Sequence, residues 1–174
     1  MEKGLIQVYT GNGKGETTAT LGLALRALGH GMKVLIIQFM KEKSGDSEEK
    51  AARRFSPNLT IISAGREGSV SKSDPEPAEV SSAQEGFLIA KRAVEGKEYD
   101  VIILNGINTA IDDGLLSLPD LLHLIDSKPS TIELILTGRN ASPEVLDRAD
   151  LVTEMVERKH HCTKGISARK RNKK

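Results

Sequence analysis

Short apolar runs alternate with stretches of helical spacing along most of the chain. The runs predicted to be strands are apolar throughout or nearly so, and they cover residues 5–9, 33–39, 59–63, 99–104, 132–137 and 151–154. The stretches predicted to be helices are 15–28, a short segment ending near Phe55, 80–94, 115–125 and 142–148. Strands without a polar face, separated by helices, are typical of a parallel sheet that is covered on both sides. The pattern therefore predicts an α/β fold with about six parallel strands and helices on both faces.

The first predicted strand runs directly into a glycine-rich segment. Residues 11–15, called the glycine loop below, read Gly-Asn-Gly-Lys-Gly and precede the first predicted helix. Glycines allow backbone bends with positive φ, and a helix N-terminus offers unpaired N–H groups and a partial positive charge. A loop of this kind between a strand and a helix is a receptor for phosphate. The alternative is a glycine-rich helix cap that binds no ligand.

The glycine loop nearly matches the P-loop pattern G-x-x-x-x-G-K-[ST], so the predicted sheet is P-loop NTPase-like. Thr10 stands at the first glycine position and Glu16 stands at the lysine position. The backbone frame of a phosphate site is therefore nearly complete, but its cation has been replaced by an anion. Ligands of parallel sheets bind at the carboxyl ends of the strands, so we expect the other strand-end loops to meet at this edge.

Composition and charge narrow the remaining possibilities. A length of 174 residues, with 38% hydrophobic and 28% charged residues, fits one domain, predicted to span residues 1–158. The net charge of +1 creates no overall field that would attract nucleic acid or a membrane. The single cysteine, Cys162, excludes an internal disulfide, and no leader or membrane span is visible, so we expect a cytoplasmic protein. Residues 159–174, which are rich in Lys and Arg, are expected to form a flexible, solvated tail. Binding of this tail to nucleic acid is the less favoured alternative.

Several further segments match one known family in order and spacing. They are the glycine loop with Thr17-Thr18-Ala19, then Arg26-Ala27-Leu28-Gly29-His30-Gly31, Gln38-Phe39-Met40-Lys41, Thr137-Gly138-Arg139-Asn140-Ala141, residues 149–155 and Lys159-His160. Over nearly its whole length the chain resembles the bacterial P-loop type of ATP:corrinoid adenosyltransferase. The resemblance implies a six-stranded P-loop fold, usually a homodimer. It also implies transfer of a 5′-deoxyadenosyl group from ATP with Mg²⁺ to a Co(I) corrinoid, with release of triphosphate.

The resemblance also implies roles for individual residues. The expected phosphate ligands are the loop residues and the hydroxyl that follows them: Asn12, Gly13, Lys14, Gly15 and Thr18. Thr17 is expected to offer its hydroxyl to Mg²⁺. Three cations are further candidates for contact with the nucleotide, namely Arg26, Lys41 and Arg139. For Arg26 an ordinary surface charge on the helix is an equal alternative.

Glu16 is the main departure from the family pattern. A lysine about 4 Å from a phosphate oxygen attracts it by about 4 kcal/mol at an effective dielectric constant of ~20, and a glutamate repels it by a similar amount. Even a third of this difference of about 8 kcal/mol, after screening, weakens triphosphate binding roughly a hundredfold. We therefore expect Glu16 to act as a resident anion that faces the phosphate site.

A second departure follows the predicted strand 99–104. The family carries an Asp-Glu pair there that serves Mg²⁺, and this chain has Asn105 and Gly106. An asparagine still offers a carbonyl oxygen, but both negative charges are lost. We interpret Asn-Gly as a plain strand-to-loop turn, for which this dipeptide is well suited. Asp112 and Asp113, farther along, are expected on a solvated loop.

The third departure concerns the corrinoid. Residues 65–79 are rich in Gly, Ser, Pro and charge and are predicted to form a mobile loop. Family members place aromatic residues in this loop against the corrinoid, including a tryptophan. This chain has no tryptophan, and only 3% of its residues are aromatic. A corrinoid remains a possible substrate, but the family's means of activating cobalt is expected to be missing.

The histidines and the cysteine near the C-terminus suggest a metal site only superficially. His160, His161 and Cys162 are adjacent, which is not the spacing of a zinc site, so we do not predict a metal centre there. His30 is expected to belong to the turn that ends the first long helix.

Three functional hypotheses remain. The first is a corrinoid adenosyltransferase by descent, with its scaffold intact and its activity impaired. The second is a non-catalytic nucleotide- or corrinoid-binding protein that regulates or assists an active paralogue. The third, a P-loop ATPase or kinase of another kind, is least favoured because the loop lysine and the acidic pair are both absent.

Overall fold

The structure is a computed structural model that describes residues 3–41, 47–65, 75–160 and 165. Its strands are β1 (Ile6–Thr10), β2 (Val34–Phe39), β3 (Leu59–Ala64), β4 (Val101–Asn105), β5 (Glu133–Thr137) and β6 (Leu151–Glu154). Its α-helices are α1 (Glu16–Gly29), α2 (Ser47–Ala52), α3 (Pro77–Gly96), α4 (Ile107–Asp112), α5 (Leu118–Asp126) and α6 (Pro143–Arg148), with a 3-10 turn at Arg53–Phe55.

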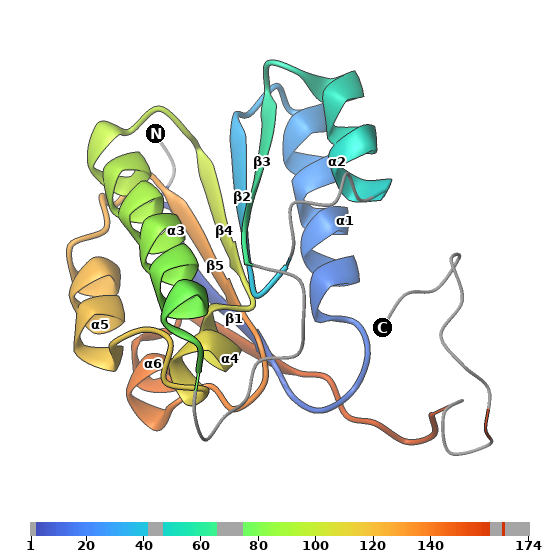
Figure 1. The fold of residues 1–174 in the computed structure, drawn as a ribbon. Coiled ribbons are helices and arrows are strands. Elements are labelled where there is room, and N and C mark those ends of the chain that lie inside the picture. The colour runs from blue at the N-terminus through green and yellow to red at the C-terminus, as the bar shows by residue number, and fades with distance from the viewer. Residues whose placement is uncertain (1–2, 42–46, 66–74, 161–164, 166–174) are drawn as a thin grey trace.

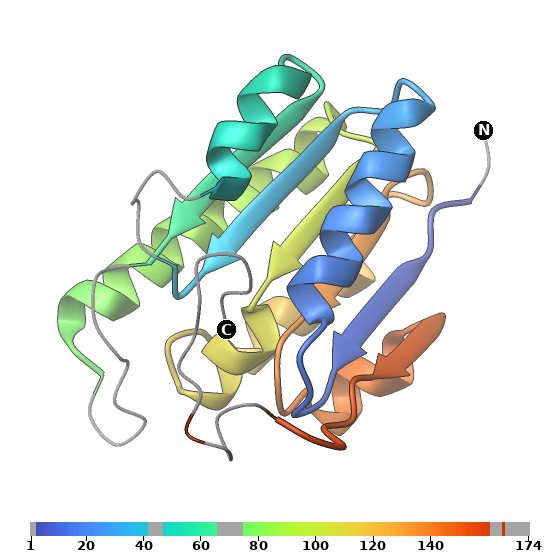
Figure 2. The same cartoon turned by 90° about the vertical axis from the view of Figure 1, so that its right-hand side faces the viewer.

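The six strands form one parallel sheet in the order β3-β2-β4-β5-β1-β6. The predicted α/β fold with a parallel sheet of about six strands is therefore confirmed. Helices α1 and α2 lie on one face of the sheet, and α3, α4, α5 and α6 lie on the other (Figures 1 and 2). All strands point the same way, so their carboxyl ends lie along one edge, where the glycine loop joins β1 to α1.

Successive side chains of each central strand pack into two different cores. In β2, Val34 and Ile36 face α1, whereas Leu35 and Ile37 face the larger core under α3 and α5. This period of two is the geometry of a strand, and burial on both faces explains why the run is apolar throughout. The edge strand β6 differs, since all four of its residues are exposed.

Two helices begin at other residues than predicted. Helix α3 begins at Pro77 rather than residue 80, because Glu76 and Glu79 form a capping box there. Helix α5 begins at Leu118 rather than residue 115, where the Ser117 hydroxyl accepts a hydrogen bond from the Asp120 N–H at 3.4 Å. The predicted mobile loop 65–79 is therefore wrong for residues 77–79, and its residues 66–74 lie outside the described part of the chain.

Helix α4 was not predicted. It begins directly after Gly106, whose φ of 87° is the left-handed conformation that glycine adopts without strain. The expectation of a plain turn after β4 is thus wrong, because the chain enters a helix at once.

Among the described residues, no helix has the length and apolar character required to cross a bilayer.

Candidate functional site

The glycine loop is held tightly against the segment that follows β6. The Met155 N–H donates to the Thr10 carbonyl at 2.7 Å, and the Gly13 N–H donates to the Met155 carbonyl at 2.7 Å. A Cβ at Gly11 or Gly13 would lie 2.4 or 2.8 Å from the Met155 carbonyl oxygen, which a real side chain cannot do. The glycines are therefore required by this close approach of two backbones as well as by the positive φ of 112° at Gly11.

The N-terminus of α1 faces the open side of the loop. Gly15, with φ of 154°, is the N-cap, and no side chain among the described residues caps the helix. The N–H groups of the first turn have no partner within the helix, and the helix dipole adds partial positive charge. The structure thus places the glycine loop directly before a helix N-terminus that no described side chain caps, and the phosphate receptor stays a prediction.

Glu16 places a carboxyl group at this positive helix end. Its side chain is partly buried, and its Oε1 atom is buried without a hydrogen-bond partner among the described residues. Burial is the main cause that raises the pKa of Glu16 from 4.5 to about 7, while the positive charge of Arg139 acts in the opposite direction. Near neutral pH the carboxyl group is therefore divided between its charged and neutral forms.

Asn105 connects three elements below the glycine loop. Its Oδ1 accepts hydrogen bonds from the Thr137 hydroxyl at 2.7 Å and from the Thr17 hydroxyl at 3.3 Å. The Thr137 hydroxyl oxygen in turn accepts the Gly106 N–H at 2.9 Å. Asn105 is buried. Its neutral hydrogen bonds to Thr17 and Thr137 tie α1 to β4 and β5. This link could not be predicted from the sequence, because it depends on the register of strands that are distant in sequence.

A row of polar side chains crosses the sheet at the level of Asn105. Gln38 in β2 is paired in register with Ser63 on one side and with Asn105 on the other. The Gln38 carboxamide is buried, and neither its oxygen nor its nitrogen has a partner among the described residues. The same holds for Asn108 in α4. The position of Gln38, a polar residue within the apolar run 33–39, was a sequence signal for this site. No feature of the sequence pointed to Asn108.

The structure brings some of the predicted ligands together. Asn12 and Arg139 line one cavity of about 490 Å³ with Glu154, Met155, Val156 and Glu157. Lys14, in the loop, and Thr18, in the first turn of α1, are exposed. Lys41 follows β2, and its Nζ lies 3.5 Å from the Glu48 carboxylate. These placements are compatible with their predicted roles and do not test them.

Other candidates lie farther away or differ from expectation. Arg26 is in the last turn of α1, ten residues and therefore about 15 Å along the helix from Glu16. His30 caps the end of that helix, as predicted. The expectation of a solvated loop is wrong for both aspartates, since Asp112 is the last residue of α4 and Asp113, the C-cap of that helix, is only 6% exposed. Asp112 is exposed and accepts the Asn140 side-chain N–H at 2.7 Å.

No metal centre is indicated in the described part of the chain. Groups of three or more His, Cys, Asp or Glu side chains that could hold a metal ion are absent from it. His161 and Cys162, weighed above as ligands, lie outside the described residues.

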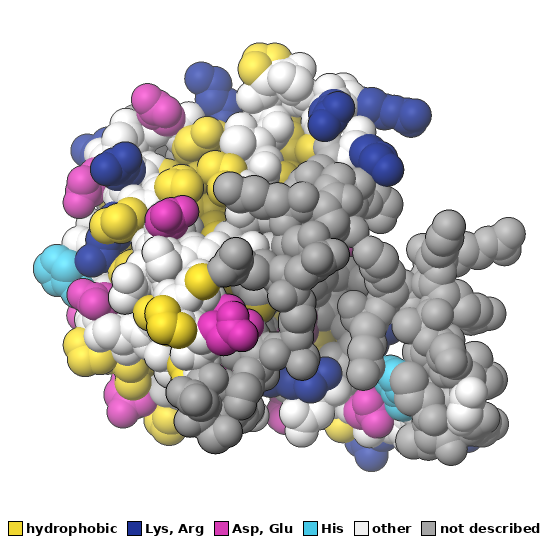
Figure 3. Space-filling model, in the orientation of Figure 1, with side chains coloured by type: hydrophobic (Ala, Val, Ile, Leu, Met, Phe, Trp, Pro, Cys, Tyr) yellow, Lys and Arg dark blue, Asp and Glu magenta, His cyan; other side chains and the backbone are white. Residues whose placement is uncertain are grey.

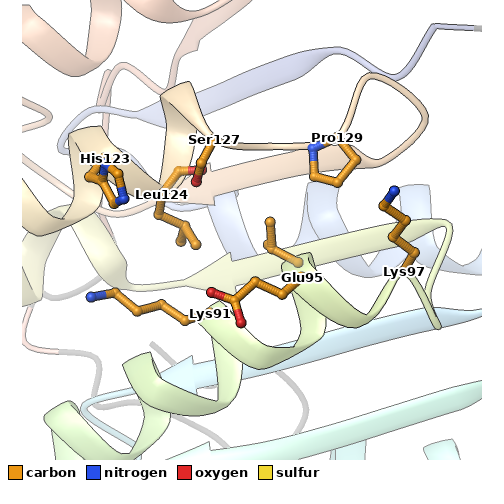
Figure 4. A pocket seen from close by; sticks show the side chains of 8 residues that line it. Lys91, Glu95, Lys97, His123, Leu124, Ser127 and Pro129 are labelled. Carbon is orange, nitrogen blue, oxygen red and sulfur yellow. The ribbon is translucent and has the colours of Figure 1, made fainter.

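A second cavity, of about 550 Å³, lies between α3 and α5 where both helices end. Lys91 and His123 lie at one end of it, and Lys97 and Pro129 lie at the other (Figure 4). The Lys91 Nζ is 3.6 Å from the Asp120 carboxylate and 5.1 Å from the centre of the Phe87 ring. Acidic and basic side chains are interspersed over this side of the molecule (Figure 3). The lining of the cavity carries Lys91, Lys97 and His123 against Glu95, and the pairing of Lys91 with Asp120 offsets part of that positive charge.

Comparison with known proteins agrees with the resemblance. A family model described as ATP:corrinoid adenosyltransferase BtuR/CobO/CobP matches residues 2–171. A corrinoid adenosyltransferase of Pseudomonas aeruginosa is 34% identical over 169 residues, which is 97% of this chain and 83% of that protein. A corrinoid adenosyltransferase of Escherichia coli is 30% identical over 167 residues, covering 96% of this chain and 84% of that protein.

Solved structures support the fold alone. The flagellar accessory protein FlaH from Methanocaldococcus jannaschii superposes with a TM-score of 0.59 at 14% identity. The superposition covers 88% of this chain and 72% of that one. At this identity the likeness extends to the arrangement of strands and helices, and function has to be argued from the site.

Proposed function

Because the chain belongs to the ATP:corrinoid adenosyltransferase BtuR/CobO/CobP family, we propose that it is a member with impaired transfer of the 5′-deoxyadenosyl group from ATP to a Co(I) corrinoid. The observation that carries the proposal is the Glu16 carboxyl group at the N-terminus of α1, where a P-loop has its lysine. The scaffold that would hold a triphosphate is present, and the charge at its centre has the wrong sign for one.

The expected loss arises from electrostatics rather than shape. The family reaction needs the triphosphate of ATP to be held while the cobalt attacks the ribose 5′ carbon, which is a matter of positioning and charge. An ionised Glu16 repels the phosphate oxygens by up to about 4 kcal/mol at ~4 Å and an effective dielectric constant of ~20. Two cations can offset this repulsion. Lys14 lies two residues before Glu16 in the sequence, and Arg139 is the positive charge that lowers the pKa of Glu16.

The residues present do not fit a strong Mg²⁺ site. At the positions where the family is expected to hold Mg²⁺, this chain has Thr17 and Asn105, both neutral, and the Asn105 Oδ1 already accepts two hydrogen bonds. Mg²⁺ binds through carboxylates together with substrate phosphates. Gly106, at the second acidic position of the family, has no side chain to contribute. We therefore expect Mg²⁺ to strengthen ATP binding only weakly.

The second candidate is a non-catalytic protein that binds a nucleotide or corrinoid and regulates or assists an active paralogue. The hydrogen bonds of Asn105 to Thr17 and Thr137 favour it, because they hold the start of α1 in place without the charge that catalysis would use. We further infer from the family a cytoplasmic homodimer with one domain, residues 1–158, and a basic tail. A native mass measurement of the full chain tests the dimer.

The experiment that tests the proposal measures adenosylcobalamin formation from ATP, Mg²⁺ and chemically reduced cobalamin. The unaltered chain is expected to be slow, and the triple variant Glu16→Lys, Asn105→Asp, Gly106→Glu is expected to be faster. Glu95→Lys, an equal change of charge on the exposed side of α3, is the matched control and leaves the rate unchanged. Rapid product formation by the unaltered chain would contradict the proposed impairment.

A further inference from the structure

A third cavity, of about 350 Å³, lies on the side of the sheet that α1 and α2 cover. One side of α1, helix α2 with the 3-10 turn after it, and the edge strand β3 line it (Figure 2). Its large apolar lining residues are Leu21, Leu25, Leu28, Phe55, Leu59 and Ile61. Among the described residues, the one charged side chain in the lining is Glu48, which is paired with Lys41 at 3.5 Å. This cavity, called the α1–α2 groove below, is therefore an apolar surface.

The walls of the α1–α2 groove are open to solvent. Leu25 is 57% exposed and Phe55 is 41% exposed, although both are large apolar side chains. Leu59 and Ile61, on the floor of the groove in β3, are only partly exposed. A pocket for a small molecule encloses most of its ligand, whereas exposed apolar walls around a groove are typical of a contact surface for protein. The groove therefore fits the side chains of another protein segment better than a small ligand.

The dimensions of the groove match those of a helix. Leu21, Leu25 and Leu28 stand at positions i, i+4 and i+7 of α1 and therefore lie on one side of it over about 10 Å. An amphipathic helix carries apolar side chains at the same spacing along its own apolar stripe. It can insert them between α1 and the 3-10 turn down to β3, as in other complexes in which a helix lies in a groove. A flat surface, such as a membrane, reaches the exposed walls but not the floor.

Unpaired basic residues lie next to the groove in the chain. Lys50 precedes the lining residue Ala51, and Arg53 and Arg54 precede Phe55. All three cations are exposed, and no ion pair among the described residues involves them. Figure 3 shows Lys and Arg side chains gathered over α2, in the upper right of the view. An apolar groove with positive charge beside it complements a partner whose apolar residues are flanked by Asp and Glu.

We propose that the α1–α2 groove is the docking site for an acidic amphipathic helix of another protein. Apolar side chains of that helix fill the space between α1 and the 3-10 turn, and its carboxylates lie against Arg53 and Arg54. Burial of apolar surface on the walls and floor supplies the affinity, and the basic residues supply selectivity and fast association. The inference concerns a partner protein and does not depend on what the glycine loop binds.

The test is binding of fluorescein-labelled synthetic peptides to the full chain, followed by fluorescence anisotropy. The acidic peptide is about four helical turns long, with Leu at positions i, i+3, i+4 and i+7 and with Glu and Ala elsewhere. A second peptide has Lys in place of every Glu, and a third has the composition of the first with Leu and polar residues in alternation. The first peptide is expected to bind about tenfold more tightly than either of the others, and more weakly as salt is added.

Leu25→Gln tests the apolar wall of the groove. Glutamine has nearly the helix propensity of leucine, so the change removes apolar surface and keeps α1. Binding of the acidic peptide should weaken about tenfold, as expected when an exposed leucine is no longer buried by the partner. Leu88→Gln is the matched control, because Leu88 is 52% exposed on α3, and it should leave the affinity unchanged.

The double variant Arg53→Glu, Arg54→Glu tests the charge. It should weaken binding of the acidic peptide about fivefold at low salt and less at high salt, because exposed charges are screened. Arg92→Glu combined with Lys97→Glu makes the same change of charge at exposed positions on and after α3, and should have no effect. Urea denaturation of each variant shows whether the fold is kept.

Other occupants of the groove give different results. Absence of binding by the acidic peptide, or equal weakening by Leu25→Gln and Leu88→Gln, would overturn the docking site. Binding of dodecanoate or of phosphatidylglycerol vesicles that Leu25→Gln weakens, without binding of the peptide, would assign the groove to a lipid instead. A dimer in native mass measurements that Leu25→Gln dissociates would assign it to a second copy of this chain. These results leave the proposed function untouched, since the adenosylcobalamin assay tests that separately.

Discussion

The polar groups at the two ends of the sheet differ in how completely they are hydrogen-bonded. At the amino ends of the strands, Lys128 Nζ donates to the carbonyls of Gly4, Pro129 and Ile132 at 3.0, 3.2 and 2.7 Å. The Leu5 N–H, just before β1, donates to the Glu133 carboxylate at 2.7 Å. These bonds satisfy backbone groups that the sheet leaves unpaired where its strands begin.

At the carboxyl ends, several buried polar atoms have no such partner. Among the described residues these are Glu16 Oε1 and both polar atoms of the Gln38 and Asn108 side chains. A buried polar group without a hydrogen bond costs about 1–3 kcal/mol. The amino edge is therefore arranged for stability, whereas the carboxyl edge bears a cost, as is expected where a fold carries its binding site.

The largest expected effect on stability is at the amino edge. Replacing Lys128 by Met leaves three carbonyls without their charged donor, so the free energy of unfolding should fall by about 2–3 kcal/mol. Urea denaturation of the full chain measures it. Lys97→Met, an exposed lysine at the end of α3, is the control and should change little. A loss of stability in Lys128→Met no larger than in Lys97→Met would contradict the claim that hydrogen bonds to backbone groups stabilise the amino edge.

At the carboxyl edge, removing the charge of Glu16 should stabilise the protein, and only above neutral pH. The folded state keeps the Glu16 proton up to a pKa of about 7, whereas the unfolded chain releases it near 4.5. The ionised group therefore lowers stability progressively as pH rises from about 4.5 through 7. With a discount for its partial exposure, Glu16→Gln should gain about 1–2 kcal/mol at pH 8 and almost nothing at pH 4.5.

Urea denaturation of the unaltered protein and of Glu16→Gln, each at pH 4.5 and pH 8, checks this prediction. Glu157→Gln, an exposed carboxylate on the segment after β6, serves as the control and should show no such pH dependence. Equal gains from Glu16→Gln at pH 4.5 and pH 8 would show that the effect is not one of ionisation.

A smaller gain is expected at Gln38. Its amide atoms make no hydrogen bond among the described residues, so replacing the side chain by Met, of similar length, removes a buried polar group and keeps the volume. Stability should rise by up to about 1 kcal/mol, measured by urea denaturation. Asn105→Leu provides the contrast, since it breaks two hydrogen bonds and should destabilise. Destabilisation by Gln38→Met would mean that the amide is satisfied in solution.

The smallest effect is expected for an exposed ion pair at the amino edge. Arg148 Nε lies 2.8 Å from the Asp126 carboxylate, and both side chains are open to solvent. Such pairs contribute little, so Arg148→Ala should leave the denaturation midpoint nearly unchanged. A clear loss of stability would mean that surface charges, and not only the caps of backbone groups, stabilise this edge.

The strands were predictable because burial on both faces makes each central strand an uninterrupted apolar run. Helix α4 was not, since six residues are too few to show helical spacing and the preceding Asn105-Gly106 is a common turn signal. The start of α3 could have been found from the capping pair Glu76 and Glu79.

The site was only partly predictable, for a physical reason. The glycine loop and Glu16 are contiguous in sequence, so the chain itself indicated a phosphate receptor with an anion in it. The bond between Thr17 and Asn105 joins residues 88 positions apart and depends on how α1 packs over β4. Burial of Asp113 likewise depends on tertiary packing, which hydrophobic periodicity does not encode.

The most direct test of the account is the affinity of the full chain for ATP at pH 8, measured by calorimetry before and after Glu16→Lys. If the carboxylate at the start of α1 opposes the polyphosphate, the variant should bind ATP about a hundredfold more tightly. Equal affinities would contradict the central claim, because they would show that the charge at position 16 does not govern what the loop binds.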